Sequence, residues 1–472
     1  MNLKKLSEKD NVAVVLDDGE AIARGHKIAL CDIKKGDLVV KYGAPIGRAT
    51  EDIAKGEWVH SHNLRSHLDE DEAYEYHPSF ASIAVSEGTF LGYARQGRRA
   101  GIRNEIYIIP TVGCVNSVAK ALEQRARALC HGSIDGVYAL THPFGCSQLG
   151  EDGENIRELL CSIAQNPNAS YCLILGLGCE NNTMAGMKKA LAGADSHIRY
   201  LVCQEVEDEL SVGEELLGEM IELAAPLTRE RVPMRELAVG LKCGGSDAFS
   251  GISANPLVGL FSDRLIAEGA STVLTEVPEM FGAERELMAR CENEEIFERY
   301  KKMIEDFKAY YTSNGFPVYE NPSPGNKEGG ITTLEEKSLG CVQKGGHSPV
   351  VDVLFSGDFA AKAGLNLLDG PGNDIIAITN LTAAGAHLIL FTTGRGTPLG
   401  APVPTVKIAT NRALAEKKAS WIDFDASSAI SDMDSCAAKL FRLTVEISSG
   451  KEAKNEINGY SEIAIFHDGV TL

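Results

Sequence analysis

The chain has 472 residues, of which 44% are hydrophobic and 24% charged, and its formal net charge is −20 at pH 7. That length predicts about two to four domains, and the acidic balance argues against nucleic acid as a partner, because phosphates need a basic surface. No apolar run reaches the ~18 residues of a membrane helix, and the N-terminal stretch lacks the apolar core of a signal peptide. We therefore expect no membrane partner and a cytoplasmic location. The 12 cysteines form no CxxC pair, which favours reduced thiols over a disulfide framework.

Residues 1–72 are expected to form a small β-rich domain. Short apolar or alternating runs are separated there by Gly and Asp turns at close spacing, and KKGDLVV and AKGEWVH look like two similar turn–strand units. The acidic and aromatic stretch 69–80 predicts the start of a linker, which we assign to residues 73–90. The alternative is that this stretch is a solvated edge of the first domain.

Residues 91–230 are expected to form an α/β domain. From Tyr107, apolar runs of strand length alternate with helical segments, which is the rhythm of a parallel sheet. In such sheets ligands bind at the carboxyl ends of the strands. Three of these strands end in the same Gly-Cys pair, at Cys114, Cys146 and Cys179.

Residues 231–472 predict a second α/β domain. Helices are expected over 256–268, 291–311 and 433–450, and buried strands over LAVGL, STVLTE, VVDVLF, IIAIT, HLILFT and VPTVKIAT. Residues 313–349 are rich in Gly, Pro, Asn and Ser and predict a long loop, which in a compact protein is usually functional or disordered.

The Gly-Cys pairs are the first candidates for chemistry. Glycine lets the backbone turn sharply, and thiolates at a strand end suit iron or zinc. For any single cysteine, including Cys243 and Cys341, the alternative is packing as a small hydrophobe. The repetition favours a functional role for at least one of them.

Histidines and arginines supply further candidates. His60 and His62 fall on one face of a strand and could form a ligand pair or a solvated face. His142 precedes Cys146 by four residues and could be a base, a ligand or a structural histidine. Arg48 and Arg103 could grip a carboxylate with a forked guanidinium, or simply belong to a basic surface.

Several long phrases resemble the altronate and galactarate dehydratase family. They include VVKYGAPIGRAT, GIRNEIYIIPTVGCVN, DGVYALTHPFGCSQLG, CGGSDAFSGISANP and ENPSPGNKEGGITTLEEKSLGC, in family order from residue 11 to the C-terminus. The wording of PTVGCVN, CSQLG, GCENN and NPSPGNK is closer to the altronate side of the family. The resemblance implies an N-terminal SAF-type β domain followed by two α/β domains with largely parallel sheets. It also implies dehydration of D-altronate to 2-dehydro-3-deoxy-D-gluconate in hexuronate catabolism, with Fe(II), or Mn(II) in its place, as the metal.

Such a reaction removes the proton next to a carboxylate and expels a hydroxyl group, so it needs a Lewis acid, a base and an anion clamp. We expect the metal where the N-terminal domain meets the strand ends of the second domain. The hypothesis names His26, His62, Cys114 and Cys146 as metal ligands, His142 or Lys27 as the base, and Arg48, Arg103 and Asn104 as substrate contacts. The three strand-end thiols also permit an iron–sulfur cluster as the alternative cofactor.

One residue departs from the family pattern. Lys242 stands before CGGSD, where the family leads us to expect an acidic residue. Glu276 and Glu279 are expected to support the site from behind or to form an acidic pair at a helix N-terminus. The alternatives to an altronate dehydratase are a galactarate-type or other hydroxy-acid lyase and a sugar-acid-binding protein without catalysis. The sequence leaves the oligomeric state open, with a homo-oligomer among the options.

Overall fold

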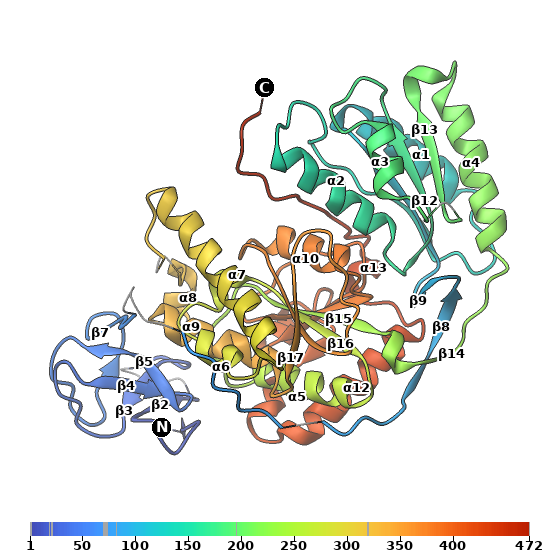
Figure 1. Ribbon diagram of the computed structural model, residues 1–472. Coiled ribbons are helices and arrows are strands. Elements are labelled where there is room, and N and C mark those ends of the chain that lie inside the picture. The colour runs from blue at the N-terminus through green and yellow to red at the C-terminus, as the bar shows by residue number, and fades with distance from the viewer. Residues whose placement is uncertain are drawn as a thin grey trace.

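The computed structural model describes residues 2–471 except residues 18, 20–21, 69–73, 82, 195 and 319–320. Figure 1 shows three units along the chain: a small β unit at the N-terminus, an α/β unit built from the last half of the chain, and a second α/β unit on the other side of it. The expected fold class, a β-rich domain followed by two α/β domains with parallel sheets, is confirmed. Residues 73 and 82 of the expected linker, and residues 69–72 at the end of the expected first domain, lie outside the described residues.

The N-terminal unit contains two small antiparallel sheets. One has the order β1-β2-β3-β6 and the other the order β4-β5-β7. The tight turn between β4 and β5 has Tyr42 and Gly43 at positive φ, as a two-residue hairpin of right-handed twist requires. The strands are β1 (Leu3–Lys4), β2 (Val12–Val15), β3 (Lys27–Ala29), β4 (Leu38–Lys41), β5 (Ala44–Ala49), β6 (Trp58–Val59) and β7 (Leu64–Arg65).

The second unit is a four-stranded sheet with helices on both faces. Its order is β11-β10-β12-β13, every neighbouring pair is parallel, and β10 is buried along its whole length, as expected for a sheet covered on both sides. A three-stranded sheet, β14-β8-β9, joins this unit to the C-terminal one. The elements are β8 (Thr89–Arg95), β9 (Arg98–Gly101), β10 (Glu105–Pro110), η1 (Gly113–Val115), α1 (Asn116–Arg127), β11 (Gly136–Ala139), α2 (Glu151–Ala164), β12 (Ala169–Gly176), α3 (Met184–Ala190), β13 (Ile198–Val202), η2 (Cys203–Glu205), α4 (Glu209–Ala224) and β14 (Glu230–Pro233).

The C-terminal unit is built on a seven-stranded parallel sheet of order β17-β18-β16-β15-β19-β20-β21. The chain order reverses at β15, which makes the carboxyl end of β15 a topological switch point where ligands bind. Its elements are η3 (Met234–Glu236), β15 (Ala238–Cys243), α5 (Ala254–Ala267), β16 (Ser271–Leu274), η4 (Val277–Glu279), α6 (Glu284–Met288), α7 (Glu294–Ser313), α8 (Pro324–Glu328), α9 (Leu334–Cys341), η5 (Val342–Gly345), β17 (Val350–Leu354), β18 (Gly364–Leu368), α10 (Asp374–Ala383), β19 (Leu388–Thr393), β20 (Thr405–Ala409), α11 (Arg412–Lys417), β21 (Phe424–Asp425), η6 (Ser427–Ile430), α12 (Met433–Ser448) and α13 (Lys454–Ile457).

Two expectations for this unit are wrong. IIAIT was expected as a strand but lies inside α10, whose N-terminus is capped by the Asn373 side chain accepting from the Ile376 amide. In a short run of apolar residues, the spacing of apolar and polar side chains cannot distinguish a buried strand from a buried helix. Residues 313–349 were expected as a loop but contain α8, α9 and η5. Among the described residues, no helix is both long and apolar enough to cross a bilayer.

Candidate active site

A cavity of about 900 Å³ lies at the carboxyl end of β15. The strand is followed by the turn Gly244–Gly245, and this turn, η4, the C-terminal part of α7 and the start of α10 form the walls. Phe316, Asn321, Ser323, Asn326 and Lys337 of α9 complete the wall, so the segment expected as a loop does border a cavity. The site therefore sits where a doubly wound sheet binds its ligands.

A buried ammonium group lies between two carboxylates at one side of the cavity. Lys242 Nζ is 2.7 Å from Glu276 Oε1 and 2.6 Å from Asp374 Oδ1. Burial by itself would lower the pKa of Lys242, but the two carboxylates outweigh burial and raise it. Lys242 thus holds Asp374, which lines the cavity and remains 39% exposed. An acid at position 242, as expected from the family, would repel both carboxylates.

Two thiols and a carboxylate lie close together beside Lys242 and its two carboxylate partners. Cys243 Sγ lies 3.5 Å from Cys341 Sγ, 3.0 Å from Glu279 Oε2 and 2.9 Å from Lys344 Nζ. The hydrogen bond from Cys341 is the largest influence that lowers the pKa of Cys243, to about 7, and Lys344 acts in the same direction. Burial would raise the pKa of Glu279, but Lys337 and Lys344 outweigh burial and lower it. The cluster therefore favours anionic sulfur and carboxylate at neutral pH.

These three side chains could hold a metal ion. The ligand atoms of Cys243, Glu279 and Cys341 all lie within 4.8 Å of one another. Among the described residues, they are the group of three His, Cys, Asp or Glu side chains that meets this criterion. Thiolate and carboxylate donors suit Fe(II) or Zn(II). Lys344 Nζ approaches both Cys243 Sγ and Glu279 Oε2, at 2.9 and 3.5 Å, so an ion bound to all three atoms would displace that ammonium group.

The N-terminal unit is fixed against the same segment by a buried charge cluster. Lys27 Nζ and Lys41 Nζ each lie 2.8 Å from an oxygen of Glu336, on α9. Burial, opposed by Glu336, lowers the pKa of Lys27 to about 8. Lys27 was expected as a base, but its ammonium group is enclosed and also donates to the Gly330 carbonyl at 3.1 Å. In this arrangement it fastens two units together.

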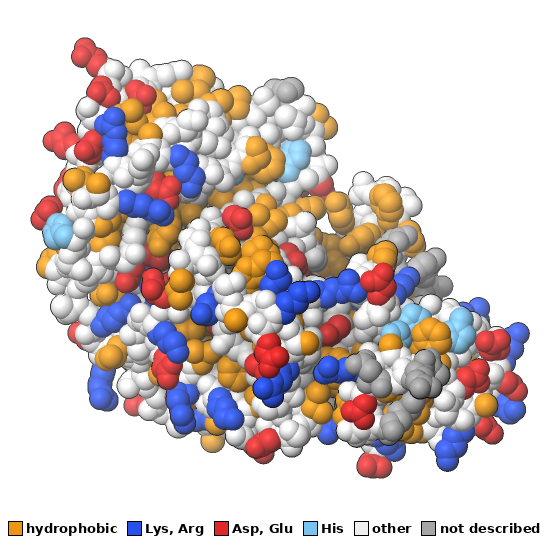
Figure 2. Space-filling model, turned by 180° about the vertical axis from the view of Figure 1, so that it is seen from behind, with side chains coloured by type: hydrophobic (Ala, Val, Ile, Leu, Met, Phe, Trp, Pro, Cys, Tyr) orange, Lys and Arg blue, Asp and Glu red, His pale blue; other side chains and the backbone are white. Residues whose placement is uncertain are grey.

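The expected histidine ligands lie on the same face of the N-terminal unit. His26 Nδ1 accepts from Trp58 Nε1 at 3.2 Å, and the rings of His60 and His62 lie 5.1 and 5.0 Å from that of Trp58. Figure 2 shows histidine side chains gathered on the surface of this small unit. His60 Nε2 contacts the Lys327 carbonyl at 3.0 Å, so the cluster borders the segment whose Asn326 lines the cavity.

The remaining expected residues lie in the second unit or on its border. Cys114 lies in η1, just after β10, and Cys146 lies in the loop after β11; both are exposed. The structure does not gather them with His26 and His62 into a group of ligand atoms within mutual reach. His142 uses both ring nitrogens on backbone atoms, contacting the Pro110 carbonyl at 2.8 Å and accepting from the Phe144 amide at 3.2 Å. It braces a loop and has no ring nitrogen left for a substrate proton.

The expected substrate contacts are occupied by protein groups. Arg103 is buried and makes five hydrogen bonds, two to Glu456 and three to the carbonyls of Ile102, Ile447 and Lys451, which uses all of its donors. Asn104 is fully buried and donates to Ser133 and Ala224. Arg48 donates to the Gly36 carbonyl within the N-terminal unit. None of the three lines the cavity.

Sequence reasoning missed Lys337, which lines the cavity, and Lys344, which is buried beside Cys243. Lys337, Cys341 and Lys344 are spaced by four and three residues, which places them on one face of a helix. That signal was hidden because 313–349 was interpreted as a loop. Asp374 was missed because IIAIT was interpreted as a strand, so no helix N-terminus was expected there.

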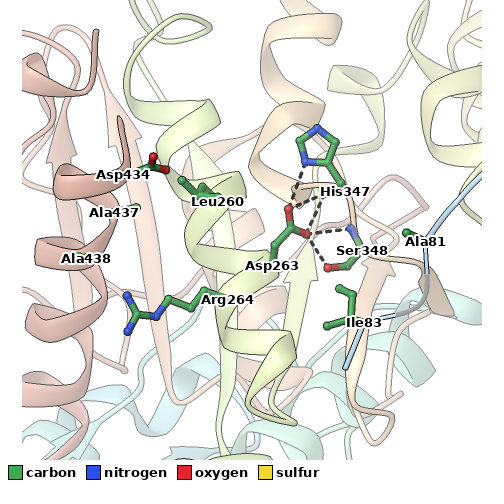
Figure 3. A pocket seen from close by; sticks show the side chains of 10 residues that line it. All are labelled: Ala81, Ile83, Leu260, Asp263, Arg264, His347, Ser348, Asp434, Ala437 and Ala438. Carbon is green, nitrogen blue, oxygen red and sulfur yellow. Dashed lines mark hydrogen bonds and ion pairs between the residues drawn. The ribbon is translucent and has the colours of Figure 1, made fainter. Parts of the chain in front are cut away.

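A second cavity, of about 550 Å³, has a different character. It lies among α5, α12, Ala81 and Ile83, and apolar side chains share its wall with charged ones such as Asp263, Arg264 and Asp434 (Figure 3). Asp263 accepts hydrogen bonds from the backbone amides of His347 and Ser348 at 2.8 Å, so this carboxylate serves the fold. The cavity at β15 is the better candidate for chemistry.

Comparison with known proteins gives one consistent answer. Family models match residues 19–67 (altronate/galactarate dehydratase SAF domain), 92–225 (D-galactarate dehydratase/altronate hydrolase, second domain) and 234–471 (D-galactarate/altronate dehydratase, C-terminal). The altronate dehydratase of Bacillus subtilis (strain 168) is 49% identical over 99% of both chains, and that of Escherichia coli (strain K12) is 47% identical over 100% of both. The galactarate dehydratase (L-threo-forming) of E. coli is 31% identical over 98% of this chain and 96% of its own. The chain belongs to the altronate/galactarate dehydratase family.

Proposed function

We propose that the protein is a hydro-lyase that converts D-altronate to 2-dehydro-3-deoxy-D-gluconate and water, with the cavity at β15 as its active site. Thiol, carboxylate and ammonium groups lie close together at the switch point of the parallel sheet. This observation supports the cavity at β15 as the active site. The two relatives named altronate dehydratases support the substrate. Both are close to this chain over its whole length, which also supports a small sugar acid as the partner and a cytoplasmic enzyme.

The cavity offers an anion clamp. Lys337 Nζ lies 3.1 Å from Glu279 Oε1 and 2.9 Å from Asn321 Oδ1, which leaves one of its three N–H donors for the substrate carboxylate. Burial would lower the pKa of Lys337, but Glu279 outweighs burial and raises it, so the group stays charged. Asn321, Ser323 and Asn326 also line the cavity and can hydrogen-bond the hydroxyl groups of a sugar acid.

Asp374 is the proposed base. It is the half-exposed carboxylate on the wall, Lys242 fixes one of its oxygens, and Gly244 leaves room beside the other. A Cβ at Gly244 would lie 2.7 Å from Asp374 Oδ2, so a larger residue would crowd the base. In the proposed reaction Asp374 takes the proton from C2 of altronate while Lys337 holds the carboxylate. Asp374 then gives this proton to the hydroxyl group on C3, which leaves as water as the C2–C3 double bond forms, and the resulting enol tautomerises to the 2-keto acid.

Cys243, Glu279 and Cys341 are the proposed ligands of a divalent metal. Thiolate and carboxylate ligands suit Fe(II), and Mn(II), which is proposed as the substitute, would rely on the carboxylate of Glu279. When bound, such an ion supplies Lewis-acid polarisation of the carboxylate as the carbanion forms.

The test is turnover of D-altronate, with D-galactarate alongside, by metal-free protein before and after Fe(II) or Mn(II) is added under anaerobic conditions. We expect metal-dependent formation of the 2-keto-3-deoxy acid from altronate. Asp374→Asn should lose turnover by ~100-fold or more, as loss of a general base does, and still bind altronate. Asp358→Asn, an exposed acid away from the cavity, is the control. Turnover of galactarate instead would reassign the substrate, and altronate binding without turnover in metal-replete protein would contradict the dehydratase.

A further inference from the structure

Three thiols lie at one edge of the second unit, away from the cavity described above. Cys114, Cys146 and Cys179 follow β10, β11 and β12, which are neighbours in the sheet and run parallel. Pro110 pairs with Leu175 across β10 and β12, and Cys114 and Cys179 each stand four residues beyond that pair. All three thiols are exposed.

The loops that carry the thiols are tied to one another. The Gly113 amide donates to the Phe144 carbonyl at 2.8 Å, which joins the first loop to the second. The Asn182 amide donates to the Gly145 carbonyl at 3.0 Å, and the Asn182 side chain donates to the Thr111 carbonyl at 3.1 Å. Each loop is therefore bonded to both of the others, within three residues of its cysteine.

The glycine before each cysteine explains the repeated Gly-Cys pair. Gly145 has φ +103°, and a Cβ there would lie 2.0 Å from the Thr111 carbonyl oxygen. A Cβ at Gly113 would lie 3.0 Å from the His142 carbonyl oxygen, and Gly178 has φ +128°. Glycine thus lets the three loops interlock, and the next residue of each loop projects a thiol to solvent. Ser147, after Cys146, has φ +74°, a strained conformation of the kind found at functional sites.

Buried polar side chains brace the same loops. His142 spans the Pro110 carbonyl and the Phe144 amide. Glu180, next to Cys179, accepts from Thr111 Oγ1 at 2.6 Å and from the Gly178 amide at 2.6 Å. Burial would raise the pKa of Glu180, but these hydrogen bonds outweigh burial and lower it. The packing of the core does not require such bracing of exposed loops. The bracing therefore indicates that these loops have a function of their own.

We propose that Cys114, Cys146 and Cys179 hold an iron–sulfur cluster of the [4Fe–4S] type. The three sulfurs do not all lie within 4.8 Å of one another, since the described residues yield no such group at this edge. The trio is therefore not a compact single-ion site. In a cluster each thiolate binds its own iron, so three cysteines on three loops that are bonded to one another can serve as its ligands. The thiols lose their protons when they bind. The fourth iron has no ligand from this trio and is open to a hydroxyl or carboxylate oxygen of a small hydroxy acid.

The cluster site is independent of the proposed active site, and the experiment separates the two. Wild-type protein is reconstituted anaerobically with Fe(II) and sulfide, and iron, sulfide and visible absorbance are measured. We expect about four sulfides and five irons per chain, because the cluster contains four of each and the site proposed at Cys243, Glu279 and Cys341 takes one more iron. Cys114→Ser, Cys146→Ser, Cys179→Ser and the triple variant should lose the absorbance, with circular dichroism unchanged. Cys31→Ser, an exposed thiol of the N-terminal unit, is the matched control and should keep it.

Cys243→Ser should also keep the cluster, because Cys243 lies in the other unit. One iron per chain without sulfide, or a cluster that survives in the triple variant, would overturn the proposal. A disulfide among the three cysteines with no iron uptake after reduction would do the same. A cluster that forms in protein unable to dehydrate altronate would support this site while contradicting the proposed function.

Discussion

Replacing Glu336 by glutamine should detach the N-terminal unit from α9. The carboxylate is 1% exposed, accepts from Lys27 and Lys41 at 2.8 Å each, and accepts from the Thr332 amide and hydroxyl at 2.8 and 2.6 Å. Burial would raise its pKa, but the two ammonium groups outweigh burial and lower it, so the group is an anion at neutral pH. Glu336→Gln leaves two buried cations without a counter-charge, and breaking a buried pair in this way costs about 3–5 kcal/mol.

The assay follows denaturant unfolding by the fluorescence of Trp58. The chain has two tryptophans, and Trp421→Phe as the background leaves Trp58 as the reporter of the N-terminal unit. Lys41→Met is the matched control and should cost less than Glu336→Gln, because one carboxylate then still faces one ammonium group. A loss below about 1 kcal/mol for Glu336→Gln, the worth of an exposed ion pair, would refute a structural role for the buried cluster.

Three further predictions concern stability. The pKa of Lys27 is about 8 in the folded protein and lies below its value in the unfolded chain. The unfolded chain therefore binds more protons, and the free energy of unfolding should rise between about pH 8 and 10.5. Lys27→Met should lack this rise when its free energy of unfolding is compared with that of the wild type across this pH range. Arg103→Lys should lower the unfolding free energy by about 2–4 kcal/mol, because lysine cannot reproduce the fork to Glu456; an unchanged denaturant midpoint would contradict this. Gly145→Ala should cost more than Gly459→Ala in thermal unfolding, since both need positive φ but a Cβ at Gly459 meets open space; equal losses would argue against the interlocked loops.

The architecture was largely determined by the sequence. The period of the apolar runs predicts the β-rich start and the two parallel sheets, because burial on both faces demands continuous apolar strands. The phrases that resemble the dehydratase family were also enough to predict the family. The Gly-Cys pairs were recognised as strand ends, and the structure places Cys114, Cys146 and Cys179 there.

The candidate site was decided by the tertiary structure. Lys337 and Lys344 are about one hundred residues from Cys243 in sequence, and only the packing of α9 and η5 against β15 brings their charges together. Arg103 and Asn104 belong to a phrase that looks functional, yet the folded chain satisfies all five donors of Arg103 internally. Residue type shows that a side chain can bind an anion. Whether its donors remain free depends on the neighbours that the fold supplies, and those come from distant parts of the chain.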